Sequence, residues 1–144
     1  MSRRVAAVVA SLLLAAGGAA SPGQAQRVDA VSPAGPNSPQ RRAILDALRP
    51  RIEAVLGGPV EFVVTRMQVQ AGWALVIAEP QRPGGGRIDG RRYFPHDFDN
   101  MDGLTVSAIM RFRGGRWMLA DHAVGATDVW YCAMRGPPRS LTGC

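Results

Sequence analysis

The sequence predicts a single α+β domain, in which one N-terminal helix packs on a curved antiparallel sheet of about four strands in two hairpins. Two observations carry this prediction. Apolar residues recur with a period of about 3.6 up to residue 56, and the period changes to 2 after residue 60. The strand-like runs then come in two pairs, each separated by two small turn-forming residues. A chain of 144 residues has room for one such domain.

The predicted helix starts at Ser38-Pro39 and stops at Gly57-Gly58-Pro59. Serine is a good N-cap, proline fits the first helical position, and glycine followed by proline ends a helix. Pro50 lies inside this segment, so we expect a kink near it or two short helices in succession. The apolar stripe that would face the core consists of Ile44, Leu45, Leu48, Ile52, Val55 and Leu56.

Residues 61–70 and 73–79 form the first predicted hairpin, and residues 104–113 and 116–124 form the second. In the second hairpin apolar and polar residues alternate, so one sheet face is expected to be apolar and the other largely wet. A two-residue turn at Gly114-Gly115 would place Asp121 opposite Ala108 on the apolar side. The same register places Arg113 opposite Arg116 and Ser107 opposite His122 on the wet side.

The N-terminus has the pattern of an export signal. Arg3 and Arg4 precede an apolar run over residues 5–16, and Gly23-Gln24-Ala25 supplies the small residues at a cleavage site. We therefore expect a signal peptide over 1–25, a flexible leader over 26–38 and localisation in the periplasm or outside the cell. The apolar run is too short to cross a bilayer, so no retained membrane span is expected.

Export makes the two cysteines informative, because an oxidising compartment favours their pairing. Cys132 and Cys144 are the only cysteines, and a disulfide between them would staple the C-terminal tail, residues 132–144, beyond a domain over 39–131. All 17 basic residues are Arg; without Arg3 and Arg4 of the signal, 15 remain against 11 acids, a net charge of +4. This modest, scattered excess indicates no nucleic-acid binding.

The order of helix and strands, with the stretches G-W-A-L and G-G-R-W-M-L after the two turns, resembles the cystatin-like and nuclear-transport-factor-like folds. The resemblance covers about residues 39–124. The chain also resembles small exported bacterial proteins of unassigned function in the stretches R-R-A-I-L-D-A-L-R, G-W-A-L-V-I-A-E-P and T-D-V-W-Y. These likenesses imply a fold and an exported context, and they imply no particular activity.

One short motif suggests a specific alternative. Gln68-Val69-Gln70-Ala71-Gly72 resembles the Q-x-V-x-G loop with which cystatins enter the cleft of papain-like proteases. The resemblance implies an inhibitor that binds through Gln68, Gly72 and the tryptophans that follow the two turns, Trp73 and Trp117. Gln70 stands where the family has valine, and Gly114-Gly115 precedes the second tryptophan where the family has proline, so the motif is incomplete.

A second alternative is an enzyme. Ketosteroid-isomerase-like and cyclase-like relatives of this fold use a carboxylate between helix and sheet, which makes Asp121 and its neighbour His122 the catalytic candidates. No further core-facing acid, His or Tyr completes a constellation, so an enzyme is the less favoured interpretation. The polar run His96–Gly103 misses the calcium-loop register by one residue, and we expect no metal and no cofactor.

We therefore expect an exported, non-catalytic binding or interaction module. The long connection over 80–103 carries Arg91 and Arg92, which would suit an unknown protein or a small acidic ligand. The wet sheet face offers Ser107, Arg111 and Arg113 as a possible homodimer surface.

Overall fold

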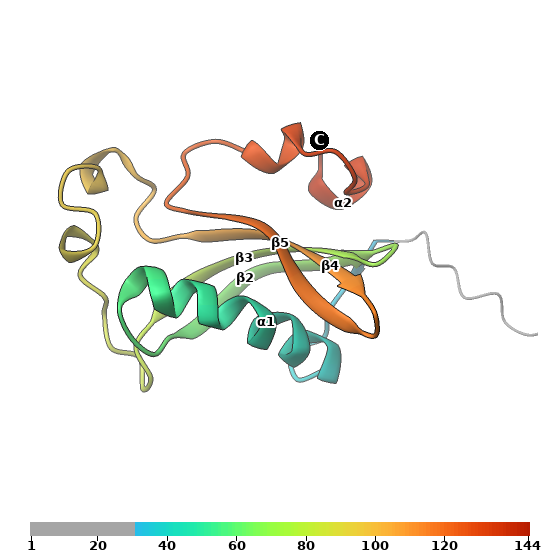
Figure 1. Ribbon diagram of the computed structural model, residues 1–144, viewed down its shortest axis with the longest axis horizontal. Coiled ribbons are helices and arrows are strands. Elements are labelled where there is room, and N and C mark those ends of the chain that lie inside the picture. Colours follow the sequence, from blue (N-terminus) through green and yellow to red (C-terminus); the bar gives the residue numbers. More distant parts are fainter. Residues whose placement is uncertain (1–30) are drawn as a thin grey trace, which may run out of the picture.

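A long helix lies across one face of an antiparallel sheet, and the C-terminal segment lies across the opposite face (Figure 1). This computed structural model describes residues 31–144, so the predicted signal peptide over 1–25 and the first part of the leader lie outside the described residues. No helix in the described part has the length and apolar character needed to cross a bilayer. In chain order the elements are β1 (Ser32–Pro33), α1 (Pro39–Leu56), β2 (Glu61–Gln70), β3 (Trp73–Gln81), the 3-10 helices η1 (Gly90–Arg92) and η2 (Phe98–Asn100), β4 (Val106–Arg113), β5 (Arg116–Val124), the 3-10 helix η3 (Trp130–Ala133) and α2 (Arg139–Thr142).

Helix α1 begins and ends where the sequence predicts. The side chain of Ser38 accepts a hydrogen bond from the Arg41 N–H at 3.1 Å. Gly57 ends the helix in the left-handed region with φ of 63°. The helix continues through Pro50 as one element, so the alternative of two short helices is wrong. Four residues of the predicted stripe are completely buried against the sheet: Ile44, Leu48, Ile52 and Leu56.

The sheet has the neighbour order β1-β2-β3-β4-β5, and all its pairs are antiparallel. Both predicted hairpins are present. Their turns, Ala71-Gly72 and Gly114-Gly115, have positive φ at every position, from 48° to 76°, as the tightest hairpin turns require. Strand β3 continues through Pro80, which β4 does not reach, so the missing N–H of the proline leaves no ladder bond unmade.

The sheet has five strands where the sequence predicted about four. The additional strand is β1, whose Ser32 and Pro33 pair with Val69 and Gln68 at the outer edge of β2. Ala34 follows and is buried in the core between helix and sheet. A two-residue edge strand that contains proline has no periodicity, so sequence patterns do not reveal it.

Strand β5 contains a β-bulge that corrects the predicted register of Asp121. The pairs nearest the turn are as predicted, up to Met110. Ala120 then has no partner, and the ladder shifts by one residue, so Ala108 pairs with His122 and no longer with Asp121. One extra residue reverses which side chains face the core. Asp121 is therefore exposed on the face away from α1, and His122 takes the position facing the helix.

The sheet face opposite α1, called the outer face below, was expected to be largely wet, and this is wrong. Leu75 and Ile109 place two completely buried apolar side chains on it, and Tyr131 and Leu141 of the C-terminal segment cover them. The disulfide between Cys132 and Cys144 joins the two ends of this cover, as predicted. The sandwich thus has three layers, and each face of β3 and β4 contributes to a separate apolar cluster.

Covering the outer face also changes the surface considered for a homodimer. Ser107 is buried beneath η3, where its Oγ accepts a hydrogen bond from the Trp130 indole N–H at 2.7 Å. Arg111 lies against the ring of Trp73. The sheet is therefore closed at these two positions, and only Arg113 of the three candidate residues is exposed.

The connection between β3 and β4 folds back onto the end of α1. Arg82 Nη2 donates to the carbonyl oxygen of Leu56 at 2.6 Å, and its Nη1 donates to that of Pro59 at 3.0 Å. The same guanidinium bonds to the Tyr93 hydroxyl at 2.9 Å. Carbonyls in the last turn of a helix have no partner within it, and a cation there also complements the helix dipole. This arginine therefore ties the connection to the helix.

Candidate functional site

The two tight turns lie side by side at one end of the sheet (Figure 1). This follows from topology, because alternate turns of an antiparallel meander fall at the same end. A hydrogen bond from the Phe112 N–H to the carbonyl oxygen of Gly72, at 2.8 Å, joins the two hairpins there. We call this region the hairpin end; it comprises both turns, Trp73 and residues 111–118.

The tip of the second hairpin carries two arginines in an unfavourable arrangement. Arg113 and Arg116 are directly paired across the strands on either side of Gly114-Gly115, and both are exposed. Within the described residues neither makes a hydrogen bond or an ion pair. Like charges directly opposite each other in a hairpin are destabilising, so these two guanidinium groups would be stabilised by an anion from outside.

Aromatic side chains accompany this charge. Phe112 is 45% exposed, although the neighbouring Trp117, whose ring centroid is 5.3 Å away, is buried against the core. Both rings line a depression of about 460 Å³ beside the start of α1, together with Arg116. An exposed large apolar side chain next to unpaired arginines is typical of a surface that contacts another molecule.

A second depression of about 280 Å³ lies on the outer face, between Trp73, Arg111 and Arg113. The Arg111 guanidinium stacks 4.1 Å from the centroid of the Trp73 ring, and its buried Nε has no hydrogen-bond partner among the described residues. A Cβ at Gly136 would come within 2.8 Å of this tryptophan, so only glycine lets the C-terminal segment pass so closely. The Trp73 ring is therefore in close contact with both Arg111 and the C-terminal segment.

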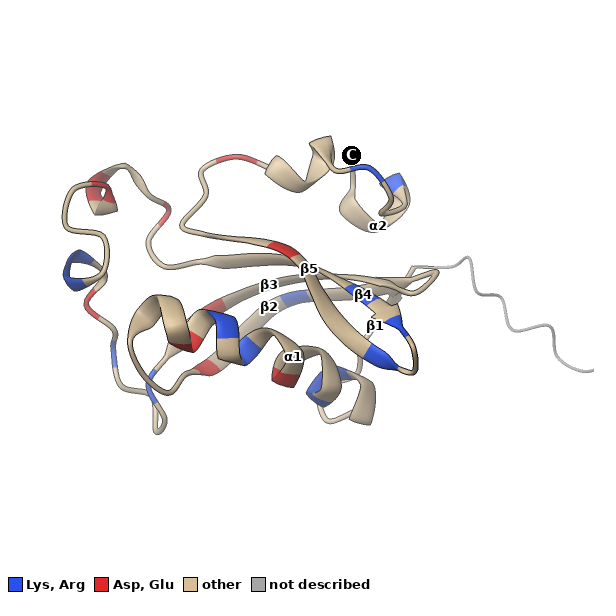
Figure 2. Ribbon diagram, viewed as in Figure 1, with Lys and Arg blue, Asp and Glu red and all other residues tan. Residues whose placement is uncertain are grey.

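The charges are distributed unevenly. Figure 2 shows arginine and acidic bands mixed on α1 and along the β3–β4 connection, whereas the hairpin end carries arginine bands without acidic ones. The two ion pairs among the described residues, Asp46–Arg49 and Arg91–Asp99, are both away from this end. The hairpin end thus presents uncompensated positive charge.

Of the binding residues predicted from the sequence, three belong to this end and three do not. Gly72, Trp73 and Trp117 lie at the hairpin end. Gln68 is turned back along β2, where its Oε1 accepts a hydrogen bond from Arg66 Nε at 2.9 Å. Ser140 of α2 donates to Gln70 Oε1, so the second glutamine of the motif is also engaged.

Arg91 and Arg92 lie in the β3–β4 connection and stabilise it. Arg91 forms a two-bond ion pair with Asp99, which raises the pKa of Arg91 and lowers that of Asp99. Arg92 lies over the ring of Tyr93. Arg116 and Phe112 were not predicted as site residues from the sequence, although the register expected around Gly114-Gly115 already placed Arg113 opposite Arg116.

The catalytic candidates form no buried pair. Asp121 is exposed, and its Oδ1 accepts a hydrogen bond from the backbone N–H of His122 at 2.8 Å. His122 Nε2 accepts a hydrogen bond from Arg51 Nε of α1 at 3.3 Å. Burial and the nearby Arg51 charge lower the pKa of His122, and Asp121 opposes them only in part. A neutral imidazole that accepts from an arginine serves as a contact between helix and sheet.

The polar run His96–Gly103 is also used for structure. Part of it forms η2, with Asp99 engaged by Arg91 and the Asp102 N–H bonded to Gly125 O. Across residues 31–144 no three His, Cys, Asp or Glu side chains are grouped closely enough to bind a metal ion.

Comparison with known proteins finds no matching family model, no matching curated protein and no matching solved structure.

Proposed function

We propose that this protein is an exported, non-catalytic binding module whose hairpin end recognises an acidic segment of another protein. The observation that carries the proposal is the exposed cross-strand pair Arg113 and Arg116, which has no ion-pair partner among residues 31–144 and lies beside the exposed ring of Phe112. Export is supported by the signal-like N-terminus and by the disulfide between Cys132 and Cys144.

The chemistry of the pair selects its partner. Side chains directly opposite each other in a hairpin have Cβ atoms about 5 Å apart. Two guanidinium groups at this spacing bind either one carboxylate between them or two neighbouring carboxylates. Arginine binds carboxylates through two parallel hydrogen bonds. Binding also removes the repulsion between Arg113 and Arg116, so part of the free energy of association comes from relief of strain in the free protein.

The shape of the tip favours a protein partner over an enclosed small molecule. A Cβ built at Gly114 or Gly115 would meet no atom within 4 Å, which shows that the turn projects into solvent. Such a tip enters a depression on a partner, with Phe112 as the apolar contact and the arginines as its polar rim.

Binding of a fluorescein-labelled hexaglutamate peptide, followed by fluorescence anisotropy at low ionic strength, tests the proposal. Each exposed arginine–carboxylate contact contributes up to about 1 kcal/mol, so the double variant R113Q/R116Q should weaken binding by about 5-fold to 30-fold. The control R87Q/R92Q removes the same charge from the opposite end and should change affinity by less than about twofold. Equal losses in both variants, or no binding of the peptide to the unaltered protein, would contradict the proposal.

One observation favours a second candidate, inhibition of papain-like proteases, because the motif-bearing turn at Gly72 and the tryptophan-bearing second hairpin lie side by side. Gln68 counts against it, since its side chain is engaged by Arg66. A titration of papain with micromolar protein decides: loss of protease activity supports inhibition, and full activity removes this candidate.

A further inference from the structure

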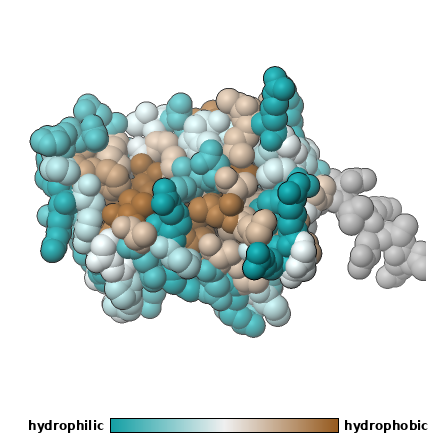
Figure 3. All heavy atoms as spheres, viewed as in Figure 1, coloured by the Kyte–Doolittle hydropathy of each residue, from teal (hydrophilic) through white to brown (hydrophobic). Residues whose placement is uncertain are grey.

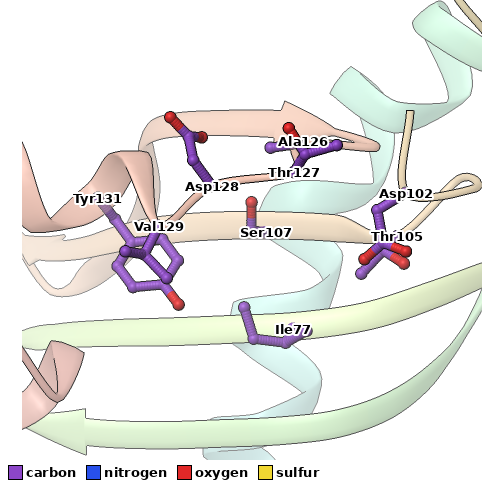
Figure 4. Close-up of a pocket in the computed structure, with 9 residues that line it drawn as sticks. All are labelled: Ile77, Asp102, Thr105, Ser107, Ala126, Thr127, Asp128, Val129 and Tyr131. Atoms are coloured by element: carbon purple, nitrogen blue, oxygen red, sulfur yellow. The ribbon is translucent and has the colours of Figure 1, made fainter. Parts of the chain in front are cut away.

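A groove at the end of the sheet remote from the hairpin turns has a different chemistry. It lies between the outer face and the segment that joins β5 to η3, and its volume is about 480 Å³. This volume is within the range of small-molecule sites. Figure 4 shows the nine lining residues: Ile77 of β3, Asp102 and Thr105 before β4, Ser107 of β4, and Ala126, Thr127, Asp128, Val129 and Tyr131 of the covering segment.

The lining combines apolar surface with oxygen atoms and contains no basic residue. Ile77 and Ser107 form the floor, and residues 126–129 form the opposite wall (Figure 4). Val129 is 57% exposed at the rim. The face of the molecule drawn in Figure 3 shows apolar surface between hydrophilic residues. The carboxylates of Asp102 and Asp128 give the groove a formal charge of −2, opposite in sign to the charge of the hairpin end.

The acidic end of the groove is built from two segments. Asp102 and Thr105 lie next to each other there (Figure 4). The Thr105 hydroxyl donates to Glu79 Oε1 of β3 at 2.5 Å, which brings a further carboxylate to this end. The groove is lined by no arginine or lysine that could neutralise these carboxylates. Carboxylate and hydroxyl oxygens arranged in this way accept hydrogen bonds from an ammonium group, which has three donors.

The opposite end contains an unused polar group. Tyr131 is only 9% exposed, and its hydroxyl has no hydrogen-bond partner among the described residues. Its ring is held edge-on by Trp130, with centroids 5.7 Å apart. In Figure 4 the hydroxyl points into the space beside Ile77. The ring is nearly buried, but the hydroxyl itself keeps contact with solvent, so it can bond a polar group that enters the groove.

From these features we infer that the groove binds a small organic amine. The ammonium group lies against Asp102 and Thr105, a short apolar chain covers Ile77, and a hydroxyl or carbonyl at the far end bonds to the Tyr131 hydroxyl. This site is independent of the hairpin end, because the two surfaces attract ligands of opposite charge.

Three probes of nearly equal size and shape test the charge requirement: 6-aminohexan-1-ol, hexane-1,6-diol and 6-hydroxyhexanoate. Titrations followed by amide chemical shifts should show the amine perturbing residues 102–107 and 126–131, with affinity at least fivefold higher than for the diol. The carboxylate probe should cause no saturable shift. Equal affinity for amine and diol, tighter binding of the carboxylate, or no shift in these residues at 10 mM amine would overturn the inference.

Two substitutions separate ligand contact from folding. Asp102→Asn should lower amine affinity at least fivefold, whereas the control Asp97→Asn, an exposed acid of the same connection, should change it less than twofold. Tyr131→Phe should lower affinity about threefold with an unchanged melting temperature, because its hydroxyl has no hydrogen-bond partner among residues 31–144. A lower melting temperature without loss of affinity would show that the hydroxyl serves the fold. Hexaglutamate binding at the hairpin end should be the same in all three variants.

Discussion

Replacing Arg82 by alanine should detach the β3–β4 connection from the end of α1. The guanidinium donates to the backbone carbonyls of Leu56 and Pro59, and to the Tyr93 hydroxyl. After truncation these carbonyls lose their charged donor, and the last turn of the helix loses a cation that complements its dipole. The folded state therefore loses interactions that the unfolded chain does not make.

The expected magnitude follows from the exposure of each bond. Hydrogen bonds with a charged partner contribute about 1.5–3 kcal/mol each when shielded from water. The bond to Leu56 is partly buried, so the lower end of that range applies, and the exposed bond to Pro59 adds about 0.5 kcal/mol. We expect Arg82→Ala to lower the free energy of unfolding by about 2 kcal/mol, which is about 8 °C in melting temperature for a domain of this size.

Equilibrium urea denaturation, followed by tryptophan fluorescence, measures this change. Arg82→Lys should lose about half as much stability, because an ammonium group cannot bridge both carbonyls. Arg87→Ala is the matched control, since Arg87 is exposed and makes no hydrogen bond or ion pair within residues 31–144. If Arg82→Ala were no more destabilising than Arg87→Ala, the assignment of Arg82 as the tie between connection and helix would be refuted.

Two further predictions concern the outer cover and the helix–sheet contact. Opening the bond between Cys132 and Cys144, by reductant or by the variant C132S/C144S, should lower the free energy of unfolding by about 3 kcal/mol for a separation of 12 residues; an unchanged urea midpoint in reductant would count against this. His122 has a lowered pKa in the folded state, so the unfolded chain takes up the proton first, and stability should fall as the pH drops below about 6.5 and level off below the folded pKa. The loss should stay below about 1 kcal/mol because the ring is partly exposed, and His122→Gln should remove it; the same pH dependence in that variant would contradict the role given to His122.

The sequence predicted the parts of the fold that depend on local rules. Ser38 and Gly57 bound the helix, and the two glycine-containing turns form the hairpins at the expected positions. The register was correct from the Gly114-Gly115 turn to Met110, because a tight turn determines which residues are opposite. The same pairing already placed Arg113 opposite Arg116, which became the centre of the candidate site.

The predictions from the sequence were wrong where the structure depends on contacts between segments far apart in the chain. The unpaired Ala120 exchanged the positions of Asp121 and His122, and no local pattern marks a bulge of this kind. Ile109 interrupts the polar alternation of the second hairpin, and residues 73–78 are apolar at every position, so the sequence did contain signs that the outer face is covered. No local pattern indicated that the connection over 80–103 is tied to the helix, because Arg82 finds its partners 23 and 26 residues earlier in the chain.

The sequence by itself determined the α+β class, the helix limits, the two hairpins and the pairing of the two cysteines, because each depends on the spacing or conformation of residues close together in the chain. Tertiary structure alone decided which surfaces are available. It buried Ser107 under the C-terminal segment, left Arg113 and Arg116 without a counter-charge among residues 31–144, and formed the open groove beside Tyr131. These outcomes depend on which side chains fill space between distant segments, and the free energy of that packing has no signature in local periodicity.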